Sequence, residues 1–212
     1  MRRVATNQSG PIGRPRAFDT EAALERAMLF FWEHGYEGAS LTGLTKAMGI
    51  STTSMYAAFG NKEELFRKAL ERYTEGPSAY LTRALEEPTA LGVATAILTG
   101  VVRTTTRPAQ PHGCLGVQGA LVTSASGSSV RDLLAAWRDD GFSRLRERFQ
   151  QAVDEGDLPP TTDAGLLGRY VSTLAFGIAV QAASGIGRDE LQSMADAALK
   201  SWPPATETRP ES

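Results

Sequence analysis

The sequence has little of several residue types on which large classes of protein function depend. One cysteine, Cys114, occurs among 212 residues, which excludes an internal disulfide framework and a zinc site built from several thiolates. The two histidines, His34 and His112, lack the spacing of a metal-binding pair. We therefore predict neither a bound metal nor a cofactor.

Long apolar runs and enzyme motifs are also missing. No run of about 18 apolar residues is present, and the first residues contain no apolar stretch of the signal-peptide type. There is no G-x-S-x-G element, phosphate-binding loop or H-E-x-x-H motif, and the adjacent Asp139 and Asp140 suit a solvated face. We expect a soluble, cytoplasmic protein without a membrane partner, without catalytic residues and without enzymatic activity.

The charge of the chain is unevenly distributed. The net charge of −2 taken alone argues against a nucleic-acid partner. Residues 1–75, however, carry ten Lys or Arg against nine Asp or Glu, whereas residues 76–212 carry twelve against fifteen. The mild positive bias lies in the N-terminal part, which also contains the motif described next.

Residues 40–62, SLTGLTKAMGISTTSMYAAFGNK, predict two short helices around a tight turn. Ser40 is placed to cap the first helix, and Leu44 and Met48 recur at helical spacing on its buried side. Gly49 then supplies a turn conformation that a side chain would resist. This order of helix, turn and helix is typical of a helix-turn-helix DNA reader.

The second of these helices has one apolar and one polar side. Met55 and Phe59 are one helical turn apart and are predicted to face inward. Thr52, Thr53 and Tyr56 project from the opposite arc. Short hydroxyl side chains allow the backbone to approach the bases of a major groove, and the tyrosine can reach a phosphate. We expect this face to contact double-stranded DNA.

Another helix is predicted to begin immediately after the reader. Asn61 and Glu64 have the spacing of a capping box. Lys62 falls in the first turn, where the helix dipole disfavours a cation. A bound phosphate would explain a lysine at this position, and a solvated surface lysine is the alternative.

Together these residues resemble the DNA-binding domain of the TetR family of transcriptional regulators. The resemblance covers about residues 13–75. Its matching elements are the Ser40-Leu41 helix start, Ala47-Met48-Gly49-Ile50-Ser51, Met55-Tyr56 before Ala58-Phe59, and Asn61-Lys62-Glu63 with Leu65. A first helix that starts at Asp19 and breaks at Gly35-Tyr36 also fits the family.

The resemblance implies a role for each matching position. The phosphate-anchoring positions correspond to Ser40, Tyr56 and Lys62. The positions that face bases or nearby backbone correspond to Thr42, Thr52, Thr53 and Ser54. Thr53 stands where many members have glycine, which leaves the operator sequence open. Thr45 stands where alanine is usual; it could bond back within its helix or touch the neighbouring helix, so no DNA contact is assigned to it.

Residues 1–16 contain four arginines and no acidic residue. Their glycine, proline and serine content predicts a flexible segment in the free protein. Gly13-Arg14-Pro15-Arg16 resembles the basic arms that some family members lay along the minor groove, where a narrow groove attracts arginine. We predict this role for Arg14 and Arg16, and a solubilising tail is the alternative.

The rest of the sequence predicts helices, at residues 89–106, 128–155, 162–184 and 188–201, with a short helix from Cys114 to about Ser124. No credible pair of strands is present. The chain is therefore expected to be all-α, with about nine to ten helices. We expect residues 17–75 to form the helix-turn-helix DNA-binding domain, residues 76–202 an effector-binding and dimerisation domain, and residues 203–212 a disordered tail.

The resemblance implies a homodimer whose last two main helices pair between subunits. Residues 164–184 are rich in glycine, alanine and serine, and because a helical glycine costs about 1 kcal/mol relative to alanine, close helix packing is a reasonable explanation. The predicted interface residues are Leu167, Val171, Leu174, Ile178, Leu191 and Met194. Packing of the same helix within its own chain is the alternative. A dimer is also what two half-sites of an operator require.

The resemblance also implies that the bundle binds a small effector, whose identity the sequence leaves open. The candidate contacts are polar or polarizable side chains on otherwise apolar helices: Arg103, Cys114, Gln118, Trp137 and Gln181. Each could instead be satisfied within the protein.

Cys114 has a second possible role. It begins a predicted helix, and a helix N-terminus lowers the pKa of a thiol. The turn His112-Gly113-Cys114-Leu115 resembles one in a branch of the family, some members of which sense oxidants or electrophiles there. A small buried apolar residue is the alternative.

These observations predict a sequence-specific transcriptional repressor that a small-molecule effector releases from its operator. A repressor that responds to oxidants or electrophiles through Cys114 is the first alternative. An activator, or an architectural DNA-binding protein, would share the same reader. A family member that acts only through protein partners, or as an enzyme, is the contrasting class.

Overall fold

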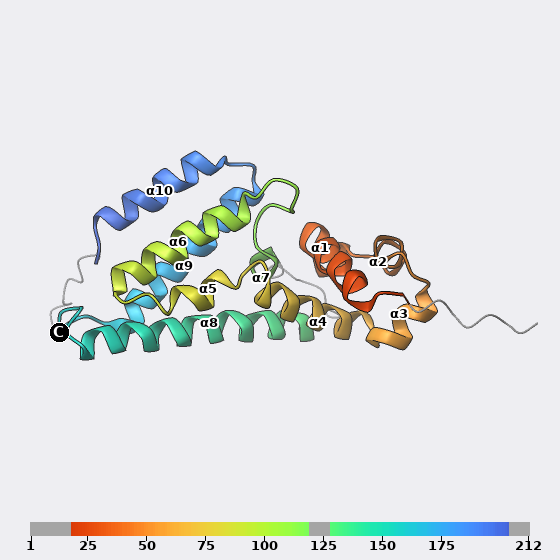
Figure 1. Ribbon diagram of the computed structural model, residues 1–212, viewed down its shortest axis with the longest axis horizontal. Coiled ribbons are helices and arrows are strands. Elements are labelled where there is room, and N and C mark those ends of the chain that lie inside the picture. The colour runs from red at the N-terminus through yellow and green to blue at the C-terminus, as the bar shows by residue number, and fades with distance from the viewer. Residues whose placement is uncertain (1–17, 119–127, 204–212) are drawn as a thin grey trace, which may run out of the picture.

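The computed structural model describes residues 18–118 and 128–203, and every regular element in these two ranges is a helix. Figure 1 shows an elongated molecule with the first three helices at one end and a helical bundle at the other. The predicted all-α class is confirmed for this part of the chain. The predicted arm, with Arg14 and Arg16, and the tail from residue 204 lie outside the described residues.

The first helix, α1 (Thr20–Gly38), has the start and the break that the sequence predicts. The Asp19 side chain accepts a hydrogen bond from the backbone N–H of Ala22 at 3.0 Å, which satisfies one donor of the first turn. Gly35 has φ 69° and ψ 173° and kinks the helix. Residues with a side chain rarely adopt this conformation, so glycine fits the kink.

Helices α2 (Leu41–Met48) and α3 (Thr52–Phe59) are joined through Gly49, whose φ of 70° lies in the left-handed region. Glycine adopts that conformation without strain, as the sequence predicts for this turn. The Arg26 guanidinium of α1 donates to the Met48 carbonyl oxygen at 2.8 and 3.2 Å. This contact satisfies a carbonyl at the end of α2 and holds the turn against α1.

Helix α4 (Lys62–Glu75) packs along α1. Arg72 of α4 donates one hydrogen bond to Glu21 at 2.8 Å and another to Glu25, both on α1. The buried side chains of α4 are Leu65, Phe66, Ala69, Leu70 and Tyr73. They share one core with the inward side chains of α1, α2 and α3.

The remaining helices are α5 (Tyr80–Ala84), α6 (Ala90–Thr105), α7 (Leu115–Gln118), α8 (Ser128–Asp154), α9 (Ala164–Ala183) and α10 (Arg188–Lys200). In Figure 1, α8 runs along the length of the bundle, α6 and α9 lie next to it, and α10 lies on the outside. The four long helices begin and end within two residues of the predicted bounds. The predicted extension of α7 to about Ser124 falls on residues outside the described ranges.

Helix α9 is the one helix in the described ranges that is long and apolar enough to cross a membrane, with a mean hydropathy of 1.3 over an 18-residue window. The sequence has no uninterrupted apolar run of that length, so this property was not predicted. Leu167, Val171 and Ile178 of α9 are buried in the bundle core against α6 and α8. The core helix of a globular domain can be as long and as apolar as a membrane-spanning helix. Helix α9 is such a core helix.

The core of the N-terminal domain continues across the predicted domain boundary at residue 75. Leu115 of α7 and Val130 and Leu134 of α8 are buried in the same cluster as the inward side chains of α1 and α4. Apolar side chains of three bundle residues thus complete the core of the DNA-binding domain. The two parts share this core rather than meeting only through a linker.

Two tryptophan hydrogen bonds cross the same boundary. Trp32 of α1 is buried, and its Nε1 donates to the Gly113 carbonyl oxygen at 3.0 Å. Trp137 of α8 donates from Nε1 to the Thr74 hydroxyl of α4 at 2.9 Å. Tyr73 lies between the two indoles, with ring centroids 4.9 Å from that of Trp32 and 6.4 Å from that of Trp137.

We expect Trp32→Phe to destabilise the whole protein rather than the N-terminal domain alone. The substitution leaves the buried Gly113 carbonyl without its donor, which costs about 1–3 kcal/mol, in addition to lost ring contacts. Urea unfolding followed by circular dichroism measures the change. Trp202→Phe is the matched control, because the Trp202 ring packs on Phe149 and its indole N–H donates no hydrogen bond within the described residues. Equal loss of stability in both variants would contradict a special role for the Trp32 bond.

Candidate functional site

The start of α2 presents two of the predicted DNA-binding residues at the surface. The Ser40 hydroxyl caps α2 by accepting from the Gly43 backbone N–H at 3.0 Å, and its side chain is exposed. Thr42, the second residue of α2, is also exposed. Thr45 is buried and donates to the Leu41 and Thr42 carbonyl oxygens at 2.9 and 3.2 Å, so it bonds back within its own helix.

Helix α3 buries one side and exposes the other, as the sequence predicts. Met55 and Phe59 are at most 2% exposed, whereas Thr52, Thr53 and Tyr56 are exposed. The Tyr56 side chain is 46% exposed and free to reach a neighbouring molecule. The exposed surface of α3 therefore consists of two short hydroxyl side chains, one phenol and the methyl group of Ala57, a surface that suits a major groove.

Ser54 differs from the threonines of the same helix. The Ser51 hydroxyl caps α3 by accepting from the Ser54 backbone N–H at 3.1 Å, and the two hydroxyls lie 2.9 Å apart. The Ser54 hydroxyl is thus part of the cap of α3 and is only partly exposed.

The capping box predicted at the start of α4 is present. The Asn61 side chain accepts from the Glu64 backbone N–H at 2.9 Å, and the Glu64 carboxylate accepts from the Asn61 backbone N–H at 3.2 Å. Both groups belong to α4 itself and to the residue before it. Two backbone N–H groups at the N-terminus of α4 are therefore satisfied without a ligand.

Lys62 lies at the surface between Tyr36 and solvent. Its Nζ is 4.4 Å from the centroid of the Tyr36 ring, which attracts a cation through its π face. Partial burial lowers the pKa of Lys62, and the nearby Glu37 carboxylate acts in the opposite direction. Tyr36 thus orients the lysine at the start of α4, beside the exposed end of the reader.

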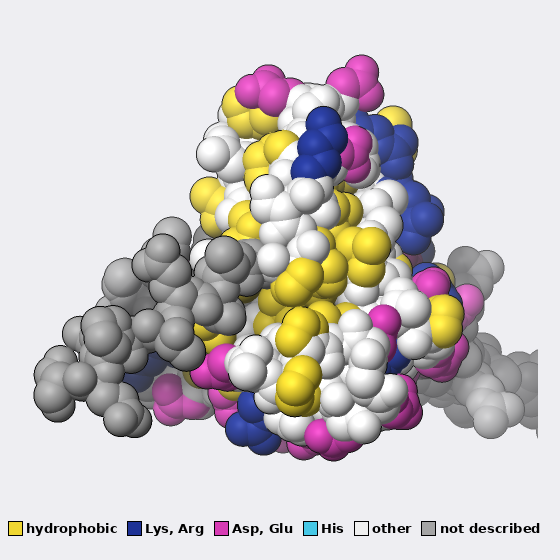
Figure 2. All heavy atoms as spheres, turned by 90° about the vertical axis from the view of Figure 1, so that its left-hand side faces the viewer, with side chains coloured by type: hydrophobic (Ala, Val, Ile, Leu, Met, Phe, Trp, Pro, Cys, Tyr) yellow, Lys and Arg dark blue, Asp and Glu magenta, His cyan; other side chains and the backbone are white. Residues whose placement is uncertain are grey.

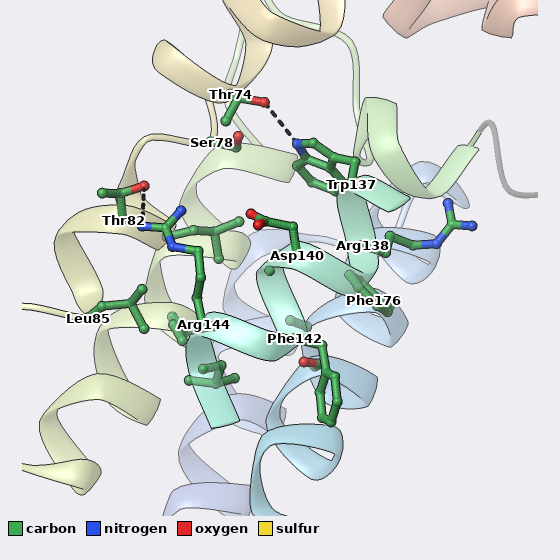
Figure 3. Close-up of a pocket in the computed structure, with 16 residues that line it drawn as sticks. Thr74, Ser78, Thr82, Leu85, Trp137, Arg138, Asp140, Phe142, Arg144 and Phe176 are labelled. Atoms are coloured by element: carbon green, nitrogen blue, oxygen red, sulfur yellow. Dashed lines mark hydrogen bonds between the residues drawn. The ribbon is translucent and has the colours of Figure 1, made fainter. Parts of the chain in front are cut away.

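A pocket in the bundle lies between α4, α5, α8 and α9 (Figure 3). It contains about 710 Å³ of empty space, part of which opens to solvent. Its apolar lining comes from Leu81, Leu85, Ile97, Trp137, Phe142, Leu145, Ala175 and Phe176. Polar side chains at its wall include Thr74, Asp140 and Arg144. This mixture of an apolar lining with a few polar side chains is typical of small-molecule sites.

The structure does not bring the five predicted effector contacts together. Trp137 lines the pocket, and its indole donates to Thr74 in the pocket wall (Figure 3). Arg103 lines a different hollow, and Gln181 is exposed on α9. The side chain of Gln118, the last residue of α7, lies outside the described part of the structure. The positions of these five residues in the sequence do not reveal which sides of their helices face a common cavity.

Cys114 does not have the environment of a reactive thiol, which its position before a helix had suggested. It is partly buried where the two cores meet. Burial raises the pKa of the Cys114 thiol, and hydrogen bonding to Tyr73 and to the backbone of Val117 and Gly116 opposes this only in part. The expectation of a lowered pKa is wrong, because desolvation outweighs the N-terminus of a four-residue helix. The thiol is in its neutral, poorly nucleophilic form at neutral pH.

The predicted dimer contacts divide into two groups. Leu167, Val171, Ile178 and Leu191 are at most 3% exposed in a single chain and belong to its own core. For these four residues the prediction is wrong, and the alternative of packing within the chain applies. Leu174 is partly buried, and Met194 is 37% exposed.

The exposed side of α9 carries a different set of residues. Leu166 and Val180 are each 53% exposed, and Gly177 between them has no neighbouring side chain within contact distance. Exposed Thr173 completes this side at helical spacing. Hydrophobic side chains also gather in a band on the end of the bundle away from α1, α2 and α3 (Figure 2).

A capped helix-turn-helix with an exposed hydroxyl-rich reader, joined to a helical bundle with a pocket, defines a DNA-binding transcriptional regulator. Comparison with known proteins identifies the family. A family model described as "Bacterial regulatory proteins, tetR family" matches residues 23–69. The chain belongs to the TetR family.

Relatives match over nearly the whole chain. The HTH-type transcriptional repressor ComR of Escherichia coli (strain K12) is 30% identical over 193 residues, which cover 90% of this chain and 92% of ComR. A cysteine mutant of the TetR family transcriptional regulator CifR, solved in complex with 26-bp double-strand operator DNA, is 42% identical with a TM-score of 0.85; the match covers 90% of this chain and all of that one.

A solved TetR-type protein from Rhodococcus sp. RHA1 is 43% identical to this chain. Its TM-score is 0.60, and the match covers 88% of this chain and 100% of that one. The similarity to these proteins therefore includes the bundle as well as the reader.

Sequence reasoning missed the residues that join the two parts. Trp32, Thr74 and Gly113 make the hydrogen bonds across the boundary. A buried tryptophan must place its N–H against an acceptor, so Trp32 could have been flagged, but its acceptor 81 residues away could not.

We expect Lys62→Gln to weaken operator binding about equally for all DNA sequences. A phosphate contact adds to the salt dependence of binding without reading bases, so the slope of log K against log salt should fall by about one per subunit. Fluorescence anisotropy with a duplex selected from a random library measures both quantities. Lys200→Gln, on α10, removes the same charge from an exposed site outside the reader and should leave the slope unchanged. An unaltered slope for Lys62→Gln would favour the solvated-lysine alternative.

Proposed function

We propose that the protein is a dimeric transcriptional repressor, which a small and mainly apolar molecule releases from its operator by binding in the bundle pocket. The observation that supports this most directly is the position of α4. Lys62 at its first residue stands beside the reader, and Thr74 at its other end lines the pocket. One 14-residue helix, about 21 Å long, connects the DNA surface with the ligand cavity.

The pocket wall indicates the class of effector. Most of the lining is aliphatic or aromatic, so an apolar body would be favoured by the removal of its surface from water. Asp140 points toward the cavity in Figure 3 and makes no ion pair within the described residues, and Arg144 is 3.4 Å from the Thr82 hydroxyl. An effector with a hydrogen-bonding group could use either side chain. We propose a molecule with an apolar body and one polar group.

Release follows if the effector favours a different position of α4. The Trp137–Thr74 hydrogen bond lies in the pocket wall, and a ligand that displaces it separates α4 from α8. Because α4 packs on α1 and follows α3, its displacement changes where the reader is held. The ligand shifts the equilibrium only by the difference in its affinity for the two arrangements.

Relatives support the direction of control. ComR and BdcR of Escherichia coli (strain K12) are named transcriptional repressors, and the CifR structure contains operator DNA. We extend repression to this chain on the basis of these similarities. The raised pKa of Cys114 gives no support to the redox alternative.

We expect Ala175→Phe to block release by the effector without impairing operator binding. Ala175 is 7% exposed and lines the pocket, so a benzyl group there fills part of the cavity. Compounds of the proposed class that release the wild type should require at least about tenfold higher concentrations, since a displaced apolar contact is worth about 1–3 kcal/mol. Anisotropy with the selected operator measures release.

The matched control for the pocket is Ala136→Phe, on the exposed side of α8, which should respond like wild type. Ser172→Leu adds less bulk to the same wall and serves if the larger substitution disturbs folding. If both pocket variants were released from the operator at the same compound concentration as wild type, the effector would bind elsewhere.

We propose that the dimer forms through the exposed sides of α9 and α10. Leu166, Gly177 and Val180 leave an apolar strip on α9, and Met194 adds to it on α10. A second copy of the chain is the partner that two operator half-sites require. A two-fold arrangement would place each strip against its own counterpart.

We expect Val180→Asp to weaken the dimer by about 100-fold or more, because an unpaired carboxylate buried in an interface costs several kcal/mol. Sedimentation should then show the 22.7 kDa monomer at concentrations where wild type is dimeric. Leu91→Asp is the control, since Leu91 is 46% exposed but lies on α6. A dimeric Val180→Asp would exclude this face.

A further inference from the structure

A second hollow lies where the DNA-binding domain meets the bundle, on the surface between the end of α4 and α6. It contains about 1100 Å³ of empty space, part of it open to solvent, and it shares no lining residue with the effector pocket. Its wall includes Glu25 of α1, Arg72 of α4, Arg83 of α5 and Arg103 of α6. We call this hollow the junction groove.

The junction groove has an excess of unpaired positive charge. Arg72 is neutralised by Glu21 and Glu25. Arg83, Arg103 and Arg107 are exposed, and none of them is within ion-pair distance of a carboxylate in residues 18–118 and 128–203. Three unpaired guanidinium groups thus face a single remaining lining carboxylate, that of Glu75.

These arginines come from three different segments. Arg83 belongs to α5, Arg103 to α6, and Arg107 to the loop that follows α6. The Arg103 charge lies close enough to buried Tyr80 to oppose the rise that burial causes in the pKa of that phenol. The fold has therefore gathered like charges around one hollow, where the Glu75 carboxylate alone is left to compensate their mutual repulsion.

The groove also offers uncharged hydrogen-bonding groups. Gln110 lines it, and its Oε1 is buried without a hydrogen-bond partner in the described residues. A buried acceptor without a donor costs about 1–3 kcal/mol. A ligand hydroxyl, or a water molecule bound with the ligand, would therefore be favoured there as a hydrogen-bond donor. Guanidinium groups bind carboxylate and phosphate oxygens through paired hydrogen bonds.

We propose that the junction groove binds a small molecule with two or more anionic oxygens, a phosphate ester or a polycarboxylate, through Arg83, Arg103 and Arg107. This site is separate from the apolar pocket and from the DNA-reading surface. It would be a second regulatory site of the protein. Its ligand would be anionic, whereas the effector proposed for the bundle pocket is mainly apolar.

The loop between α6 and α7 gives such a ligand a route to the DNA-binding domain. Arg107 and Gln110 belong to this loop, which continues to Gly113, the acceptor of the Trp32 hydrogen bond. An anion held by Arg103 and Arg107 fixes the loop on α6. It thereby stabilises the arrangement in which the Trp32 bond is made.

Thermal unfolding of the full-length protein tests the proposal. Sodium pyrophosphate, and in a second series sodium citrate, is compared with sodium chloride at equal ionic strength. At a concentration about 100 times the dissociation constant, the wild-type midpoint should rise by roughly 5–10 °C. A response to either anion supports the site, and the two series distinguish phosphate from carboxylate ligands. No response to either beyond that to sodium chloride would overturn it.

Four variants locate the binding. Arg103→Gln and Arg107→Gln should weaken the anion about tenfold or more, and because both arginines are exposed and unpaired the variants should fold normally. If one variant proves unstable without anion, the other decides. Arg188→Gln removes an exposed arginine of α10, and Lys62→Gln removes a cation of the reader; both should keep the full response. Equal responses in all four, or loss only in Lys62→Gln, would contradict binding in the junction groove.

Discussion

The hydrogen bond from Trp32 to Gly113, and the apolar core that surrounds it, is the constraint on which the rest of the structure depends. Without Leu115, Val130 and Leu134 from the bundle, the core of the DNA-binding domain is incomplete. Small domains gain little stability from a core of their own, and this one draws part of its core from the segment that follows α6. The reader is consequently held in one orientation relative to the bundle by packing, and a shift of that packing is the route by which we propose that the bundle acts on DNA.

The two cavities adjoin different contacts of the same junction. The effector pocket adjoins the Trp137–Thr74 bond and the junction groove adjoins the loop that ends at Gly113. One is lined mainly by apolar side chains and the other mainly by charged ones. Ligands of unlike chemistry could therefore bias one equilibrium independently, because neither competes for the residues of the other.

The local features of the reader could be predicted from sequence, and the contacts between distant segments could not. Asp19, Asn61 and Gly49 act within a few residues of themselves, so their spacing reveals the caps and the turn. The faces of α9 are different: leucines on a helix that is apolar all round give no sign of which side meets α6 and which meets solvent, and Leu167 was placed on the wrong side for that reason. Cys114 illustrates the same limit, since only the fold shows that desolvation controls its pKa.

The capping box at the start of α4 has a consequence for the energetics of DNA recognition. Because Asn61 and Glu64 cap α4 from within the chain, and Ser40 and Ser51 cap α2 and α3, the three helices that carry the predicted DNA contacts are formed before DNA arrives. Association then requires no folding of these three helices and carries no entropy cost of ordering their backbone. The free energy of the contacts goes into affinity and discrimination, and the encounter can be as fast as the approach of two rigid bodies allows.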